Sequence, residues 1–139
     1  MILLTRTVLP FLLDRLSGID GYYTAFRLAF YGGTDPQRVT EPPPSNPLAQ
    51  YDFPSPWATP NNGTQVAKIG PIKTTVLATG APSFWRLLGF HASVWSSVVH
   101  GSIGLAGSSA DIKVRTLEWV LGDPLTLQVI RIYPLKLSY

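Results

Sequence analysis

The fold class is decided by one stretch of alternating sequence, Ile72-Lys73-Thr74-Thr75-Val76-Leu77-Ala78-Thr79. The residues counted in twos from Ile72 share one face of an extended chain, and those counted from Lys73 share the other. A period of two indicates a β-strand with one buried face. The same alternation recurs in residues 112–115 and 125–129. The sequence therefore predicts a mainly β protein.

Further strands are expected on both sides of this stretch. Residues 22–31, 84–90 and 94–103 are aromatic and apolar runs, and residues 48–53 could hold one short strand. Short strands at regular spacing need two facing sheets to make a core. The expected fold is an antiparallel β-sandwich, with a barrel as the alternative. The turns that close the runs are Gly32-Gly33, Asn62-Gly63, which suits a type I′ hairpin, and Gly122-Asp123-Pro124.

One short helix is expected near the N-terminus. Leu9, Leu12, Leu13 and Leu16 recur at helical spacing, and Gly18 is placed to end the helix. A helix of about three turns must dock on something to persist. Two alternatives stay open for the helix and the apolar residues before it. They cover an open end of the domain's own core, or they reach a neighbouring subunit.

The chain divides into an N-terminal arm with the short helix, residues 1–21, and a β-sandwich domain, residues 22–139. Within the second part, residues 34–60 are rich in proline, which removes ladder donors and favours extended chain. Tyr51, Phe53 and Trp57 interrupt the prolines, so we expect an ordered arm rather than a linker. Because such rings are costly to leave in water, the arm is expected to make contacts outside its own domain.

The composition favours a protein whose surface is partly covered by a partner protein. Only 14% of the 139 residues are charged, against roughly 25% in ordinary soluble domains, although a monomer with a polar uncharged surface is the alternative. Lys and Arg are scattered singly, so no direct binding of nucleic acid is expected. Residues 1–13 are apolar but interrupted, which suits neither a membrane span nor a signal peptide. We expect the chain to begin at Met1, in the cytoplasm of the producing cell.

No residue pattern indicates catalysis, a metal or a cofactor. The chain has no cysteine, which excludes disulfides and thiolate ligands. His91 and His100 have no neighbouring carboxylate at ligand spacing, so no metal site is expected. Ser102, His100 and Asp111 could be imagined as a catalytic triad, but no Gly-x-Ser-x-Gly motif frames a serine. We therefore expect a non-enzymatic protein with no cofactor.

Apolar and aromatic side chains are the candidates for contact with a partner. Trp85 and Trp119 lie inside strand patterns and are expected in the core. Trp57 and Trp95 lie in loop-like sequence and could contact a partner, as tryptophan often does at interfaces. The candidate interface residues are Ile2, Leu3, Leu4, Phe11, Tyr51, Phe53, Trp57 and Trp95.

Several segments, in a fixed order, carry a resemblance to a known family. Residues 26–36, Phe-Arg-Leu-Ala-Phe-Tyr-Gly-Gly-Thr-Asp-Pro, are similar to an opening motif L-R-I-Y-x-G-T-x-P. Residues 78–87 resemble A-T-G-T-A-x-W-F-R-L, and residues 101–104 with 110–112 resemble G-S-V-G-x-x-G-x-D-L. Leu48-Ala49, Phe53-Pro54, Gly122 and the final run 125–135 match the remaining elements. Over about residues 9–137 the chain thus resembles a group of small tailed-bacteriophage proteins encoded among virion genes.

The resemblance implies a jelly-roll-like capsid cement or decoration protein with no catalytic residues. Its partner would be the major capsid protein, or another virion protein, and it would act as a homo-oligomer without contacting a membrane. Its location would be the virion, assembled in the bacterial cytoplasm. The alternatives are a tail or neck component and a carbohydrate-binding β-sandwich for host attachment. A sugar binder should display exposed Trp or Tyr beside Asp or Asn.

Overall fold

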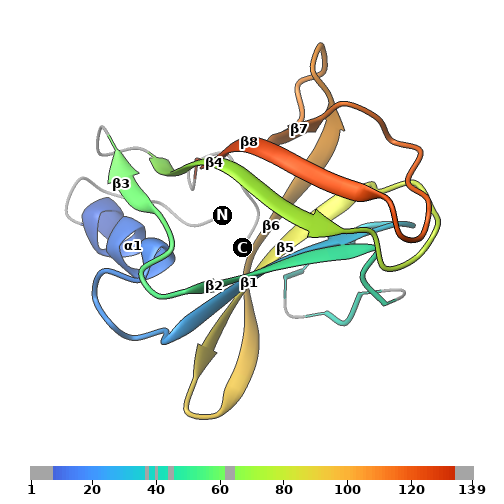
Figure 1. Ribbon diagram of the computed structural model, residues 1–139. Coiled ribbons are helices and arrows are strands. Elements are labelled where there is room, and N and C mark those ends of the chain that lie inside the picture. Colours follow the sequence, from blue (N-terminus) through green and yellow to red (C-terminus); the bar gives the residue numbers. More distant parts are fainter. Residues whose placement is uncertain (1–7, 37, 40, 44–45, 62–64, 134–139) are drawn as a thin grey trace.

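The computed structural model describes residues 8–36, 38–39, 41–43, 46–61 and 65–133, which form a mainly β fold with one short helix (Figure 1). The helix is α1 (Val8–Ser17), close to the predicted range. The strands that follow are β1 (Ala25–Tyr31), β2 (Ala49–Pro54), β3 (Thr59–Asn61), β4 (Gln65–Thr75), β5 (Phe84–His91), β6 (Val94–Leu105), β7 (Ile112–Val114) and β8 (Pro124–Ile132).

The strands form two sheets. The larger sheet has the order β2-β1-β5-β6-β7, and the smaller one has the order β3-β4-β8 (Figure 1). More than half of residues 65–133 lie in the antiparallel strands β4, β5, β6 and β8, which confirms the predicted β content. The larger sheet curls into a half-barrel facing the smaller one. The mainly β class is confirmed, whereas the jelly-roll-like arrangement stays a prediction.

The prediction of purely antiparallel pairing is wrong at β7, which pairs with β6 in parallel from Ile103–Ile112 onward. The chain turns back within a short loop because Asp111 binds Ser102. The Ser102 N–H donates to Asp111 Oδ2 over 3.0 Å, and the Asp111 N–H donates to the Ser102 hydroxyl over 3.2 Å. These bonds place the start of β7 beside β6, so only a three-residue strand forms.

The core lies between the two sheets and is filled by alternating side chains. Phe26, Leu28 and Phe30 of β1 are fully buried, and they pack with Trp85 and Leu87 of β5 in one cluster. The cluster also contains Ile72 and Val76, while Lys73, Thr75 and Leu77 are exposed, as the alternating stretch predicts. Trp85 and Trp119 are 0% and 3% exposed, which confirms their expected place in the core.

The helix α1 packs on the core of its own domain. Leu13 and Leu16 are buried in the same cluster as the strand residues, and α1 contacts β3 and β4 (Figure 1). Gly18 ends the helix with a φ of 90°, and its N–H donates to the Asp14 carbonyl over 3.1 Å. For the helix, this favours the first of the two alternatives. Residues 1–7 lie outside the described part.

Two sequence expectations have other outcomes. Trp119 was expected inside a strand, but it forms only an isolated bridge to Gly80. The predicted turn Asn62-Gly63 lies outside the described residues. Its flanking strands β3 and β4 are paired antiparallel up to Asn61 and Gln65.

The two sheets meet along two seams. At the first seam, between β2 and β4, the Thr74 hydroxyl donates to the Gln50 carbonyl over 2.9 Å. The Tyr51 hydroxyl donates to the Leu125 carbonyl of β8 over 3.0 Å, which also joins the sheets. At the second seam β7 and β8 approach each other. Side-chain hydrogen bonds therefore join the two sheets on the side of β2 and β4. On the side of β7 and β8 no backbone hydrogen bond joins them among the described residues.

Candidate functional site

The proline-rich part of the chain contributes rings to the domain's own core. Tyr51, Phe53 and Trp57 are 3%, 8% and 3% exposed and belong to the main core cluster. Tyr51 stacks on Phe53 at 6.2 Å between ring centroids, and Phe53 stacks on Trp57 at 5.2 Å. The inference that these rings need an outside partner to leave water is therefore wrong, because their own domain covers them. A partner contact of the arm stays a prediction.

Buried hydrogen bonds hold this row of rings. The Trp57 indole N–H donates to the Leu16 carbonyl of α1 over 2.7 Å, and the Trp57 backbone N–H donates to the Ser17 carbonyl over 3.0 Å. These bonds use two of the carbonyls that a helix leaves free at its C-terminal end. Burial raises the pKa of the Tyr51 hydroxyl well above its usual value. The two hydrogen bonds of Trp57 thus fix the C-terminal end of α1 against the strands.

The other predicted interface residues have different outcomes. Ile2, Leu3 and Leu4 lie outside the described residues, and Phe11 belongs to α1, with its side chain outside the described part. Trp95 is half-buried at the outer end of the β5–β6 hairpin, where it packs on Phe90 at 5.0 Å.

One face of the Trp95 indole is covered within the chain. The Arg27 guanidinium lies 4.4 Å from its ring centroid. Arg27 is itself held by Asp52, with Nε–Oδ1 and Nη2–Oδ2 distances of 2.7 and 3.2 Å. Trp95 is therefore the described candidate with surface left for a partner.

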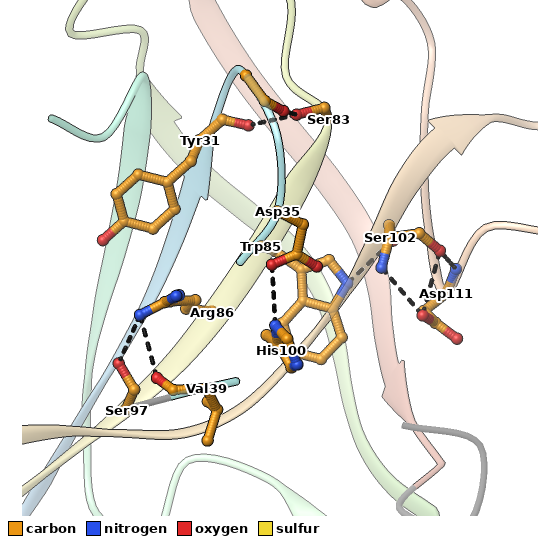
Figure 2. Close-up of polar contacts among 11 residues, drawn as sticks. Tyr31, Asp35, Val39, Ser83, Trp85, Arg86, Ser97, His100, Ser102 and Asp111 are labelled. Carbon is orange, nitrogen blue, oxygen red and sulfur yellow. Dashed lines mark hydrogen bonds and ion pairs between the residues drawn. The ribbon is translucent and has the colours of Figure 1, made fainter. Parts of the chain in front are cut away.

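Residues 32–36 and 38–39 lie on the face of the larger sheet that points away from the main core (Figure 2). Asp35 Oδ1 lies 2.9 Å from His100 Nδ1 of β6, and the Val39 carbonyl accepts from Arg86 Nη1 of β5 over 3.1 Å. Ala29, Tyr31 and Phe84 form a second small core on this face. The early part of the proline-rich segment therefore covers this face of the sheet, and we call residues 32–36 and 38–39 the cover; that the whole arm is ordered stays a prediction.

This cover buries two nitrogen-rich side chains. Arg86 and His100 are 2% and 4% exposed. Arg86 Nη1 also donates to the Ser97 hydroxyl over 3.4 Å, but Arg86 Nε, Arg86 Nη2 and His100 Nε2 have no partner among the described residues. No carboxylate is paired with Arg86 in that part of the chain. A buried guanidinium without a counter-ion lowers the free energy of unfolding. The contacts of Arg86 and His100 with the cover therefore come with a loss of stability.

The imagined triad is not assembled. His100 is bound to Asp35, while Ser102 is bound to Asp111 through its hydroxyl over 3.2 Å (Figure 2). A nucleophilic serine needs its hydroxyl bonded to the imidazole base, and here the base and the serine have separate carboxylates. This arrangement orders two loops, and it does not activate a nucleophile.

His91 is also engaged in structure. Its Nδ1 lies 2.9 Å from the Tyr22 carbonyl, and its ring stacks on Tyr22 at 3.8 Å between centroids. Within the described ranges no three His, Asp or Glu residues gather as a metal site would require. The expectations of no metal and no enzymatic activity stay predictions.

An exposed apolar patch lies on two neighbouring loops, and it was not among the candidates from sequence. We define the apolar patch as Leu77, Val120 and Leu121, which are 51%, 52% and 65% exposed. The two loops are tied together because the Leu121 N–H donates to the Thr79 hydroxyl over 3.0 Å and the Gly122 N–H donates to the Val76 carbonyl over 2.9 Å. A group of exposed large apolar side chains is typical of an interaction surface.

The sequence did contain a signal for this patch. Leu77 falls on the polar face of the alternating stretch, between Thr75 and Thr79, where a leucine is out of place. Val120 and Leu121 stand directly before the turn at Gly122, where polar residues are usual. Both departures could have been read as surface contacts, but only the fold shows that the two loops adjoin.

In the described part of the chain, no helix is long and apolar enough to cross a membrane. Comparison with protein-family models, curated proteins and solved structures found no match. The functional proposal therefore rests on the sequence motifs and on the surface.

Proposed function

We propose that the protein is a non-enzymatic structural component of a bacteriophage virion, which binds the lattice of the major capsid protein as a homo-oligomer and stabilises the head. The observation that carries the proposal is the apolar patch. Leu77, Val120 and Leu121 are each more than half exposed on a chain in which only 14% of residues are charged. Such a surface suits a protein whose patch is covered by a neighbour in the assembly.

The order of the sequence motifs supports the assignment to a virion, and the jelly-roll-like arrangement implied by them belongs to the same proposal. The surroundings of the patch suit the role, because its two loops are hydrogen-bonded to each other. A preorganised surface loses little entropy on binding. Many copies on a lattice give a multivalent shell, so each contact can be weak.

The experiment compares phage particles with and without the protein. We expect particles that lack it to release DNA at a lower temperature than complete particles, measured by dye access to DNA during heating. Complementation with Leu121→Glu should fail to restore the protein to particles, because a carboxylate at a buried apolar contact is costly. Ala106→Glu, an exposed change in the loop before β7, is the matched control and should be incorporated normally.

The alternatives predict other outcomes. Particles that resist heating equally without the protein but lack tails would move the assignment to the tail or neck. Intact particles that fail to attach to cells would favour the carbohydrate-binding alternative. Trp57, Trp85 and Trp119 do not serve that alternative, because they are at most 3% exposed. The ring it would use is Tyr22, which is 40% exposed and whose backbone N–H donates to Asp20.

A further inference from the structure

Two buried side chains beneath the cover have nitrogen atoms that lack a hydrogen-bond partner among the described residues. These atoms are Nε and Nη2 of Arg86 and Nε2 of His100. Arg86 and His100 are 2% and 4% exposed and lie directly opposite each other in the antiparallel pair of β5 and β6 (Figure 2). Opposite residues in such a pair share one face of the sheet, with Cβ atoms about 4.5–5.5 Å apart. One small ligand can therefore contact both side chains.

The unpartnered donors of Arg86 form a fork that fits a carboxylate. Arg86 Nη1 is already used, because it donates to the Val39 carbonyl and to the Ser97 hydroxyl over 3.1 and 3.4 Å. Nε–H and Nη2–H lie side by side on another edge of the planar guanidinium and donate in parallel, which is the geometry that binds both oxygens of a carboxylate. No carboxylate pairs with Arg86 in the described part of the chain. Arg86 is thus a buried cation with a free carboxylate-binding edge.

His100 supplies a further donor when its ring is protonated. Its Nδ1 lies 2.9 Å from Asp35 Oδ1, and an ionised carboxylate only accepts hydrogen bonds, so Nδ1 carries a proton. Nε2 is then bare in the neutral ring and an N–H donor in the charged ring. Tyr31 also lies beside the cluster, and burial raises its pKa while the charge of Arg86 opposes that rise. A negative ligand next to Arg86 therefore favours the protonated ring of His100.

We propose that Arg86 and His100 form a binding site for a single carboxylate group. The oxygens of this carboxylate accept from Arg86 Nε and Nη2 and from Nε2 of protonated His100, so binding takes up one proton. Arg86 Nη1 keeps its bonds to Val39 and Ser97, and the cover stays attached. The Asp35 side chain is 37% exposed, so solvent reaches the border of the site there.

The negative charge of Asp35 restricts which anions fit. A doubly charged anion such as sulfate would be repelled by this neighbouring carboxylate more strongly than a singly charged carboxylate. The ligand is either a small free carboxylate ion or a carboxylate side chain of a partner protein, since both present the same planar group. The site does not depend on the virion assignment.

The first test compares the melting temperature of the full chain in sodium formate and in sodium chloride. We expect about 100 mM formate at about pH 6 to raise the melting temperature by roughly 3 °C or more over chloride, because it binds the folded state. The gain should be smaller at about pH 8, because binding takes up a proton. Arg86→Met should abolish the gain, and it is expected to fold because an apolar side chain can replace a buried charge.

Arg27→Met is the matched control for Arg86→Met. Arg27 lies on the neighbouring strand β1, opposite Leu88 and therefore on the same face of the sheet as Arg86, but it is paired with Asp52. The formate gain should therefore persist in Arg27→Met. An equal formate gain in Arg86→Met and in the wild type would overturn the proposal.

The second test follows the imidazole signals of the wild-type chain by NMR, so it does not depend on the folding of a variant. The chain has two histidines, and His91 is the internal control. We expect formate to shift the signals of His100 saturably and those of His91 little. A blocked tripeptide with a central aspartate distinguishes the sources, because tighter binding than formate assigns the site to a partner side chain and weaker binding assigns it to a free ion. No response of His100 to either ligand, or tighter binding of sulfate than of both, would overturn the proposal.

Discussion

At the scale of single residues, burial separates two tryptophans that the sequence placed in the same group. Trp57 is 3% exposed and its indole N–H donates to the Leu16 carbonyl, whereas Trp95 is half-buried and its indole N–H makes no hydrogen bond to the described residues. Trp57→Phe should lower the free energy of unfolding by roughly 1–3 kcal/mol, because it leaves a buried carbonyl without its donor. Trp95→Phe should change it by less than about 0.5 kcal/mol. Urea unfolding measures both, and equal effects would contradict this assignment.

Tyr51 gives a pH-dependent prediction at the same scale. Burial raises the pKa of its hydroxyl above the ordinary value of 10.0, as it does for Tyr31 and Tyr23. Below pH 10 the folded and unfolded states both keep the Tyr51 proton. Above pH 10 the unfolded state loses this proton first and therefore binds fewer protons, so the free energy of unfolding falls as pH rises, by about 1.4 kcal/mol per pH unit for this tyrosine.

The measurement is urea unfolding at a series of pH values on either side of 10. Tyr51→Phe removes the titrating group together with the hydrogen bond to Leu125, so it should lower stability at neutral pH and flatten the fall above pH 10. An equally steep fall in Tyr51→Phe would show that other tyrosines cause the effect.

At the scale of elements, the proline-rich cover depends on few polar contacts. Residues 32–36 and 38–39 are held to β6 by the contact of Asp35 with His100, and to β5 by the hydrogen bond from Arg86 to the Val39 carbonyl. Arg38 is exposed and Val39 is buried, so trypsin cleavage after Arg38 requires this cover to lift. Asp35→Ala should speed the cleavage roughly fivefold, because the loss of a hydrogen bond of about 1 kcal/mol raises the open population by that factor.

The control for this prediction is Asp52→Ala. It removes an ion pair with Arg27 on the same sheet, with Asp52 more than half exposed, and does not touch the cover. Its cleavage rate after Arg38 should match that of the wild type. Equal acceleration in both variants would indicate general loosening of the fold and would contradict the specific role of Asp35.

The elements also show which parts of the fold were predictable from sequence. The strands at β5, β6 and β8 and the short helix α1 were found because their patterns repeat over a few residues. The parallel pairing of β7 was missed because it depends on contacts between Ser102 and Asp111, not on any periodicity. The Asp35–His100 contact was missed because it joins residues 65 apart in the chain. Local patterns carry secondary structure, while side-chain partners depend on the tertiary arrangement.

At the scale of the whole molecule, the candidate site was the least predictable part. Aromatic residues of the proline-rich region were expected at an interface, because the sequence indicates a short strand at residues 48–53 but not that this strand, β2, packs in the core. Because these rings are buried, side chains that remain exposed in the folded chain are the better candidates for contact with a partner. These side chains include the apolar patch, which arises from two loops that meet only in the folded chain.

The apolar patch also leads to a prediction for the purified protein in solution. If copies associate through it, the wild-type chain should sediment as a multiple of 15.2 kDa, with a mass that rises with protein concentration. Leu121→Glu should shift the protein toward monomer, because the side chain is 65% exposed in the single chain but would be desolvated between copies. The same change should leave the melting temperature of the monomer nearly unaltered, since Leu121 lies outside the core. Analytical ultracentrifugation with a thermal melt distinguishes the cases. A wild-type chain that stays monomeric at all concentrations would leave the patch to a different protein, and a large loss of melting temperature in Leu121→Glu would show that the patch serves the fold instead.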